Sequence, residues 1–269
     1  MVINKDTQLC VSIAERPGNF GTVIHNAAFK YCKLNFIYKA FSVTNLENAI
    51  RGIKGFNIRG CGVSMPFKEA VIPFLDWIDP TALKIGAINT IVNDNGQLKG
   101  YNTDVYGVTT SIVNLNLNSN TTVLIKGAGG IAKAIIFALK NNGLQNIYIS
   151  NRTRKKAELL AEEMSIHATE LPISPTFLIN ATSVGMAPNN EESIFTEEQI
   201  KRATFILDVP TNPITTKLNK IATLYKKQFI PGYKISLYQA AKQFELYTNC
   251  NAPLDVMQST LKGLLNDKI

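Results

Sequence analysis

The stretch Thr122-Val123-Leu124-Ile125-Lys126-Gly127-Ala128-Gly129-Gly130-Ile131-Ala132 decides the fold. Thr122–Lys126 is an apolar run of buried-strand length, and Gly130–Asn142 has the period of a helix. Between them, the first glycine permits a tight turn, and the second lets backbone approach a pyrophosphate at the helix N-terminus. Glycine-rich turns also occur for packing alone, but the strand before and the helix after favour binding. The stretch therefore predicts a dinucleotide-binding turn formed by Gly127, Ala128, Gly129, Gly130, Ile131 and Ala132.

The neighbouring sequence repeats this alternation of short apolar runs and helical periods. Downstream, the runs are Ile147–Ser150, Phe177–Asn180 and Phe205–Asp208. Such alternation is typical of βαβ units around a parallel sheet, so we expect an α/β protein with a Rossmann domain. Two further helical patterns, at about Ile235–Tyr247 and Leu254–Leu265, close the chain.

A second series of elements precedes the glycine turn. Leu9–Ile13 and Phe36–Phe41 are predicted strands around a helix near Thr22–Tyr31. Arg59–Ser64 is a third strand, after which we expect Pro66 at the first position of a helix. Ile88–Val92 and Gln97–Tyr101 flank a hairpin turn at Asn93-Asp94-Asn95-Gly96. The polar stretch Asn114–Asn120 is a candidate boundary between the two series.

The composition is that of a globular protein. The chain has 269 residues, of which 45% are hydrophobic, and carries a formal net charge of +8. With about 150 residues to a domain, this length fits one large domain or two smaller ones. The basic residues are scattered and no nucleic-acid-binding motif is present, so we expect no nucleic acid partner.

Cysteine spacing and hydropathy indicate where in the cell the protein is expected and whether it binds a metal. Cys10, Cys32, Cys61 and Cys250 show no CxxC spacing, which argues against a zinc site, and we expect no metal. The N-terminus lacks the apolar run of a signal peptide, and no stretch of about 18 apolar residues could span a membrane. We expect a cytoplasmic protein, monomeric or homodimeric, with no membrane partner.

The segment after Ile147–Ser150 discriminates between cofactors. It reads Asn151-Arg152-Thr153-Arg154-Lys155-Lys156. NAD-binding proteins usually place an acidic residue about 20 residues after the turn to bind the ribose 2′-hydroxyl. A carboxylate would repel a 2′-phosphate, whereas a guanidinium binds one bidentately. A solvated basic helix start is the alternative, but cations there oppose the helix dipole. The segment favours NADP.

Two upstream segments contain a candidate proton-transfer pair. One includes Ser64-Met65-Pro66-Phe67-Lys68, and the other Asn102-Thr103-Asp104. Hydride transfer from an alcohol needs a base for the hydroxyl proton, and a lysine oriented by a carboxylate can serve. Most lysines and aspartates are surface residues, so the residue types alone are weak evidence.

Together these segments resemble the shikimate dehydrogenase family. The family order is VxxPFK, AxNT, NTD, GAGG, NRT, NATSxG and a late QA. This chain carries Pro66-Phe67-Lys68, Asn89-Thr90, Asn102-Thr103-Asp104, Gly127–Gly130, Asn151-Arg152-Thr153, Asn180–Gly185 and Gln239-Ala240. The resemblance implies an NADP-dependent dehydrogenase acting on shikimate or a similar cyclic hydroxy acid, in aromatic amino acid biosynthesis. It implies that Lys68 and Asp104 are the catalytic dyad.

The resemblance also implies a domain plan and further roles. Residues 1–104 and 236–269 would form the substrate-binding and catalytic domain, and residues 105–235 an inserted Rossmann domain that binds NADP. Contacts to the substrate hydroxyls would come from Ser64, Asn89, Asp104 and Gln239. Besides the glycine turn, the cofactor contacts would be Asn151, Arg152, Thr153, Lys156, Thr182, Ser183, Gly185, Met186, Asp208 and Gly232.

The chain departs from the family where substrate is held. The family usually has Ser-x-Ser-Pro in the first strand–helix turn, where this chain has Asn19-Phe20-Gly21-Thr22. Gly62 and Thr211 stand where the family has Asn and Tyr. These changes are typical of the divergent shikimate dehydrogenase-like subgroup, so we expect weak or altered activity on shikimate, with Asn19, Gly21 and Thr22 at the substrate. His25 is expected to pack or cap locally. A non-catalytic NADP-binding protein that kept the fold is the alternative.

Overall fold

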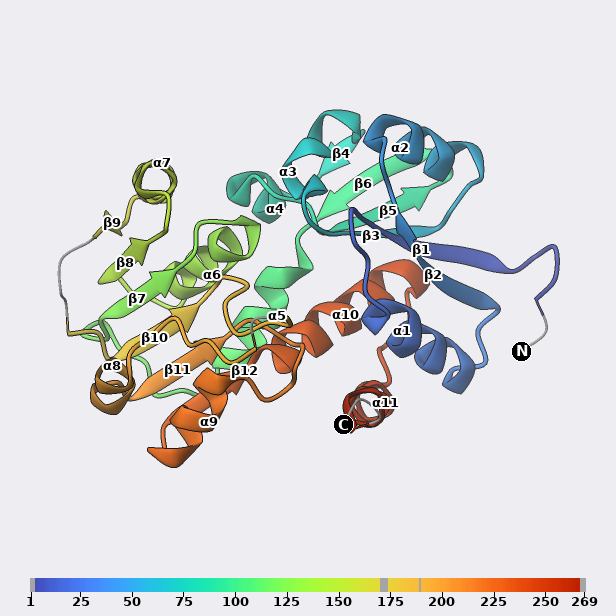
Figure 1. The fold of residues 1–269 in the computed structure, drawn as a ribbon. Coiled ribbons are helices and arrows are strands. Elements are labelled where there is room, and N and C mark those ends of the chain that lie inside the picture. The colour runs from blue at the N-terminus through green and yellow to red at the C-terminus, as the bar shows by residue number, and fades with distance from the viewer. Residues whose placement is uncertain (1–2, 170–173, 189, 267–269) are drawn as a thin grey trace. The chain divides into compact units, whose positions relative to one another are not determined.

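A computed structural model describes residues 3–169, 174–188 and 190–266. The chain forms two compact units, one of Met1–Thr103 with Gln239–Ile269 and one of Asp104–Tyr238. Each unit contains a six-stranded sheet flanked by helices (Figure 1). The predicted α/β class is confirmed, as is the return of the C-terminal helices to the N-terminal region.

The sheet of the first unit is mixed, with strand order β2-β1-β3-β5-β6-β4. Its parallel part joins β1 (Gln8–Ala14) to β2 (Phe36–Ser42) and to β3 (Gly60–Val63). β5 (Thr90–Asp94) and β6 (Gln97–Tyr101) form the expected antiparallel hairpin, and β4 (Trp77–Ile78) lies parallel at the edge. Asn95 and Gly96 turn the hairpin with φ values of 52° and 90°, as the sequence predicts.

The helices of the first unit include α1 (Phe20–Tyr31), α2 (Leu46–Gly55) and α4 (Pro80–Ile85). The last helix of the chain, α11 (Leu254–Asn266), also belongs to this unit. The short helix α3 (Phe67–Ala70) follows β3, and Pro66 is its N-cap residue. The prediction of Pro66 at the first helical position was therefore wrong by one residue, because the helix begins only at Phe67.

The two faces of β3 differ in the size of their side chains. Cys61 and Val63 pack with Val11, Ile50 and Ile53 on one face. On the other face, Gly60 and Gly62 lie in register with Cys10 and Ser12. We call these four residues the glycine face. A Cβ atom added to Gly60 would lie 2.3 Å from the ring of Tyr247 in α10 (Gly232–Thr248), so the missing side chain lets that ring pack against the strand.

The sheet of the second unit is parallel throughout, with order β12-β11-β10-β7-β8-β9. This order reverses between β7 (Val123–Lys126) and β10 (Phe177–Asn180), which is the Rossmann arrangement. The other strands are β8 (Ile147–Ser150), β9 (His167–Ala168), β11 (Phe205–Asp208) and β12 (Gln228–Pro231). Its helices include α5 (Thr103–Ile112), α6 (Gly130–Asn141), α7 (Arg154–Met164), α8 (Glu197–Arg202) and α9 (Lys217–Leu224).

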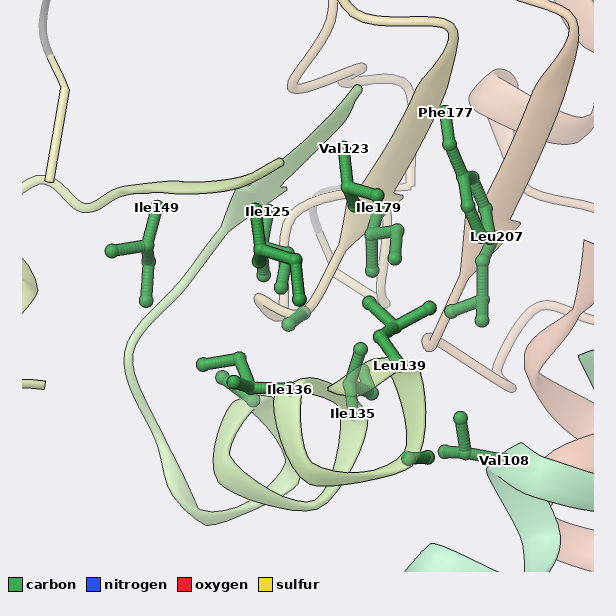
Figure 2. Close-up of a cluster of buried hydrophobic side chains, with 14 of the residues drawn as sticks. Val108, Val123, Ile125, Ile135, Ile136, Leu139, Ile149, Phe177, Ile179 and Leu207 are labelled. Atoms are coloured by element: carbon green, nitrogen blue, oxygen red, sulfur yellow. The ribbon is translucent and has the colours of Figure 1, made fainter. Parts of the chain in front are cut away.

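Apolar side chains fill both faces of this sheet. On one face, Ile125, Ile179 and Leu207 pack against Ile135 and Leu139 of α6, with Val108 of α5 beside them (Figure 2). Because Val108 and Ile112 are buried in this core, α5 belongs to the second unit. The Asn114–Asn120 stretch therefore does not separate the units, which divide between Thr103 and Asp104.

Within the part of the chain that the structure describes, no helix combines the length and the apolar character that crossing a membrane requires.

Candidate active site

The glycine turn after β7 has the geometry of an anion-binding turn. Gly127 has φ +114°, and a Cβ atom there would lie 2.6 Å from the Ala181 carbonyl oxygen, so only glycine fits. Gly129 is the N-cap of α6 and makes no side-chain cap, and nothing lies within 4 Å of its Cβ position. The start of α6 thus has no side-chain cap and has open space beside Gly129, which suits a pyrophosphate. Ala132 is buried, while Ala128 and Ile131 pack at the edge of the core.

The basic segment after β8 is exposed. Arg152, Thr153 and Lys156 are exposed, and Thr153 is the N-cap of α7 without a side-chain cap. The Asn151 side chain donates to the Thr153 carbonyl at 3.1 Å. A cavity of about 70 Å³ lies beside this segment, lined in part by Ser150, Asn151, Arg154 and Glu158. Arg154 is paired with Glu158 at 2.8 Å, and Arg152 is exposed just after the end of β8.

Asn180, at the end of β10, organises the loop that follows it. Its side-chain oxygen accepts from the Thr182 N–H at 3.0 Å and the Thr182 hydroxyl at 2.6 Å, and its amide donates to the Val184 carbonyl at 2.9 Å. Gly185 continues the turn with φ +87°. Ser183 and Met186 are exposed on this loop. The hydrogen bonds connect the start of the loop to the end of β10, and the two exposed side chains follow on the same loop.

Asp208, at the end of β11, is fully buried and bound to polar neighbours. It accepts from the Asn180 amide at 2.7 Å and from the Thr216 hydroxyl. Burial raises the pKa of Asp208 to about 6, against the two hydrogen bonds, which lower it. Gly232 is also internal, since a Cβ atom there would meet the Val209 carbonyl. Both residues position the backbone around the loops after β10 and β11.

In the first unit, Ser64 and Lys68 follow directly on β3. Ser64 is exposed, and its N–H donates to the Ile13 carbonyl at 3.0 Å. Lys68 is half-buried in α3, and its carbonyl accepts from the Ile88 N–H at 2.7 Å. Parallel strands place ligand-binding groups beyond their carboxyl ends, and both side chains lie there.

A buried polar network lies beside them. The Asn89 carbonyl oxygen of the side chain accepts from the Thr103 N–H at 2.7 Å, and its amide donates to the Thr103 hydroxyl at 3.0 Å. Thr103 also donates to Gln239 at 3.3 Å. Gln243 donates to the Thr90 hydroxyl at 2.9 Å and to the Asn89 carbonyl at 3.2 Å. Asn89 thus fixes the backbone of Thr103, the residue that precedes Asp104. Asp104 itself is 6% exposed.

The first turn of α1 lacks side-chain hydrogen bonds at its start. Asn19 is the N-cap and makes no capping bond. Gly21 and Thr22 lie in the first turn and are partly exposed. The Thr22 carbonyl accepts from the Asn26 amide at 2.7 Å. These positions therefore present backbone N–H groups and few side-chain hydroxyls.

Sequence reasoning missed Gln243 and Asn26. Gln243 follows Gln239 by one helical turn, a spacing that could have indicated a shared face of α10. Asn26 binds the backbone of Tyr38 on β2, a contact between distant residues that no local pattern indicates.

Comparisons with known proteins point to one family over most of the chain. The shikimate dehydrogenase substrate binding domain matches residues 20–91, shikimate/quinate 5-dehydrogenase residues 109–226, and the shikimate 5′-dehydrogenase C-terminal domain residues 232–262. A shikimate dehydrogenase-like protein of Haemophilus influenzae is 44% identical over 253 residues, covering 92% of this chain and 93% of that protein.

Solved structures give the same result. A shikimate dehydrogenase in complex with NADP+ matches with a TM-score of 0.91 at 33% identity and covers 98% of each chain. The shikimate 5-dehydrogenase of Listeria monocytogenes, in complex with shikimate and NAD, matches with a TM-score of 0.85 at 31% identity, covering 96% of this chain and 98% of that one.

The parallel sheet with its uncapped glycine turn defines a dinucleotide-binding protein of the Rossmann class. Its matches then place it more narrowly. The chain belongs to the shikimate dehydrogenase family of NAD(P)-dependent dehydrogenases that act on CH–OH groups.

Proposed function

We propose that this protein is an NADP-dependent dehydrogenase that interconverts a hydroxyl and a keto group on shikimate or a similar cyclic hydroxy acid. The substrate would bind to the first unit through Ser64, Asn89 and Gln239, with Asn19, Gly21 and Thr22 at the start of α1. The cofactor would bind to the second unit at the glycine turn, the Asn151–Lys156 segment and the loop after β10.

The chemistry divides between a hydride and a proton. When bound at the glycine turn and the loop after β10, NADP+ would supply a hydride acceptor for the carbinol carbon. Lys68 Nζ takes the proton of the substrate hydroxyl and becomes the ammonium, and Asp104 orients that nitrogen and the hydroxyl. In the reverse direction Lys68 returns the proton.

The hydrogen bonds that Ile88 and Asn89 make to other segments are the observation that supports this dyad most strongly. These consecutive residues hold two different segments: Ile88 binds the Lys68 carbonyl, and Asn89 binds the backbone of Thr103. The Lys68 backbone and the residue before Asp104 are therefore fixed to one short stretch of chain. Such a stretch can hold a lysine and a carboxylate within reach of one hydroxyl.

Replacing either member of the dyad tests the reaction. We expect Lys68→Ala and Asp104→Asn to lower the turnover of shikimate by about 10²- to 10⁴-fold, since general acid–base catalysis contributes that much. NADP affinity should be unchanged. Lys84→Ala, at an exposed lysine of α4, is the control. Parental turnover in the Lys68→Ala protein would rule out the assignment.

Arg152→Gln tests the cofactor preference. Loss of a charged partner for the 2′-phosphate should raise the KM for NADP by about 10- to 100-fold, because hydrogen bonds to charged groups contribute about 1.5–3 kcal/mol. The KM for NAD should not change. Arg202→Gln, at an exposed arginine of α8, serves as the control. Equal rates of the parent protein with NADP and NAD would contradict the preference.

A second candidate function is NADP binding without catalysis. The bare backbone at Gly21 and Gly62 favours it, because these positions supply no side-chain hydroxyl or amide to a substrate. A panel of shikimate, quinate and related hydroxy acids separates the two functions. Tight NADPH binding with no oxidation or reduction of any panel compound would support the non-catalytic function.

A further inference from the structure

Tyr38 lies on the glycine face of the first sheet. It is on the edge strand β2, in register with Cys10, so its side chain points to the same side of the sheet as Cys10, Ser12 and Gly62. Its hydroxyl oxygen would lie 2.9 Å from a Cβ atom added to Gly62 and 3.1 Å from one added to Gly21. The hydroxyl thus occupies the space between β3 and the first turn of α1 that two missing side chains leave.

The Tyr38 hydroxyl points toward the carboxyl ends of the parallel strands. The backbone of Tyr38 is level with Cys10, but its hydroxyl reaches Gly62, which is in register with Ser12 two residues farther along β1. Ser64 follows Gly62 by two residues. Ligands of open α/β sheets bind beyond these strand ends, so the hydroxyl points toward the proposed substrate site.

Two consecutive residues of α1 hold Tyr38 in place. The Asn26 side chain accepts from the Tyr38 N–H at 2.9 Å and donates to its carbonyl at 2.8 Å. The His25 ring stacks on the Tyr38 ring with centroids 4.5 Å apart and planes 13° apart. Burial lowers the pKa of His25 to about 4, so at neutral pH an uncharged ring supports the tyrosine. Its backbone and its ring plane are both fixed.

The Tyr38 hydroxyl is a hydrogen-bond donor at neutral pH. Burial raises the pKa of Tyr38, and the nearby Ser12 hydroxyl opposes that rise. A phenol can donate one hydrogen bond and accept another, so contact with Ser12 leaves it able to bind a second partner. Neither Gly21 nor Gly62 has a side chain to be that partner.

We propose that Tyr38 is a specificity-determining residue, whose hydroxyl fills the space left by Gly21 and Gly62 and from there binds an oxygen of the substrate. This inference rests on the proposed function. It assigns to a β2 side chain a substrate contact that Gly21 and Gly62 cannot make. A side chain at either glycine would compete with the hydroxyl for the same space.

Steady-state kinetics of Tyr38→Phe and Gly62→Ala test the proposal, with each panel acid that the parent oxidises. Tyr38→Phe removes only the hydroxyl, so we expect the KM for the acid to rise about tenfold, the effect of one neutral hydrogen bond, with kcat within a factor of two. NADP affinity should not change. Gly62→Ala should also raise this KM, because its Cβ displaces the hydroxyl. Tyr31→Phe, 66% exposed at the end of α1, is the control.

The outcomes separate the two proposals. An active parent with an unchanged KM in both Tyr38→Phe and Gly62→Ala would overturn the role of Tyr38 and leave the proposed function standing. A loss of thermal stability in Tyr38→Phe with an unchanged KM would also overturn it, since it would show a structural role only. A parent that oxidises no panel acid, while binding NADPH, would overturn the proposed function and this inference together.

Discussion

Asp208 shows how one residue can stabilise a loop and still cost stability. Its carboxylate is removed from water and faces the neutral donors Asn180 and Thr216. Since burial raises its pKa from 3.8 to about 6, the native state binds a proton more tightly than the unfolded state does. Its contribution to stability is therefore largest at low pH and is lost as the pH rises through 6.

Asp208→Asn should remove this pH dependence. The amide keeps the shape of the carboxyl group and has no charge to bury. The free energy of unfolding of the variant, relative to the parent, should rise by roughly 2–3 kcal/mol between pH 4 and pH 7.5. Urea unfolding of both proteins across this range measures the difference. A difference that stays constant with pH would show that Asp208 is not protonated preferentially in the native state.

Single residues also show what the sequence could reveal. Gly127 was predictable, because a strand, a glycine and a helix in succession leave few other geometries. Tyr38 and Gln243 were not, because their neighbours are brought together by the sheet from distant parts of the chain. The departures at Gly21 and Gly62 were visible in the sequence, but their meeting point at the Tyr38 hydroxyl was not.

At the scale of elements, the β7–α6 turn combines two glycines with different duties. Gly127 combines a positive φ with a close contact to the Ala181 carbonyl, whereas Gly129 has φ −99° and open space at its Cβ. The fold therefore requires glycine at position 127, whereas we propose that the glycine at position 129 makes room for a ligand. Element boundaries elsewhere were harder to predict, since the four-residue helix α3 and the two-residue strands β4 and β9 are too short to show a period.

Alanine substitutions should separate these duties. Gly127→Ala should lower the free energy of unfolding by about 2–4 kcal/mol, from strain at positive φ plus overpacking against backbone. Gly143→Ala, also at positive φ (+81°) but with open space, should lose only the strain component. Gly129→Ala should unfold like the parent and bind NADP more weakly. Parental NADP affinity in Gly129→Ala, measured by calorimetry, would contradict a pyrophosphate at this turn.

At the scale of the whole molecule, two separate cores predict a divided response to cofactor. Ligand binding stabilises the native state of the unit that it contacts, by about 2.7 kcal/mol at a concentration of 100 Kd. Saturating NADP+ should therefore slow hydrogen exchange in β7, β8 and β10 more than in β1 and β3. Exchange mass spectrometry with and without NADP+ measures this. Equal slowing in both sheets would show that the two units open together.

The overall plan was predictable where motifs recur in order and less so where packing decides. The order of segments indicated both sheets and the return of the C-terminal helices. The polar Asn114–Asn120 stretch nevertheless misplaced the division, because the buried Val108 and Ile112 assign α5 to the second core. A polar loop indicates exposure to solvent. The buried side chains of a helix show which hydrophobic core it belongs to.

The contact of Tyr247 with Gly60 has a consequence for folding during translation. When the first 103 residues have emerged from the ribosome, β3 is complete but the Tyr247 ring that packs against Gly60 is still untranslated. The intervening unit is continuous in the chain and has all of its strands before residue 239. It is therefore the part of the nascent protein able to fold first, while the older N-terminal segment waits for the last helices to emerge.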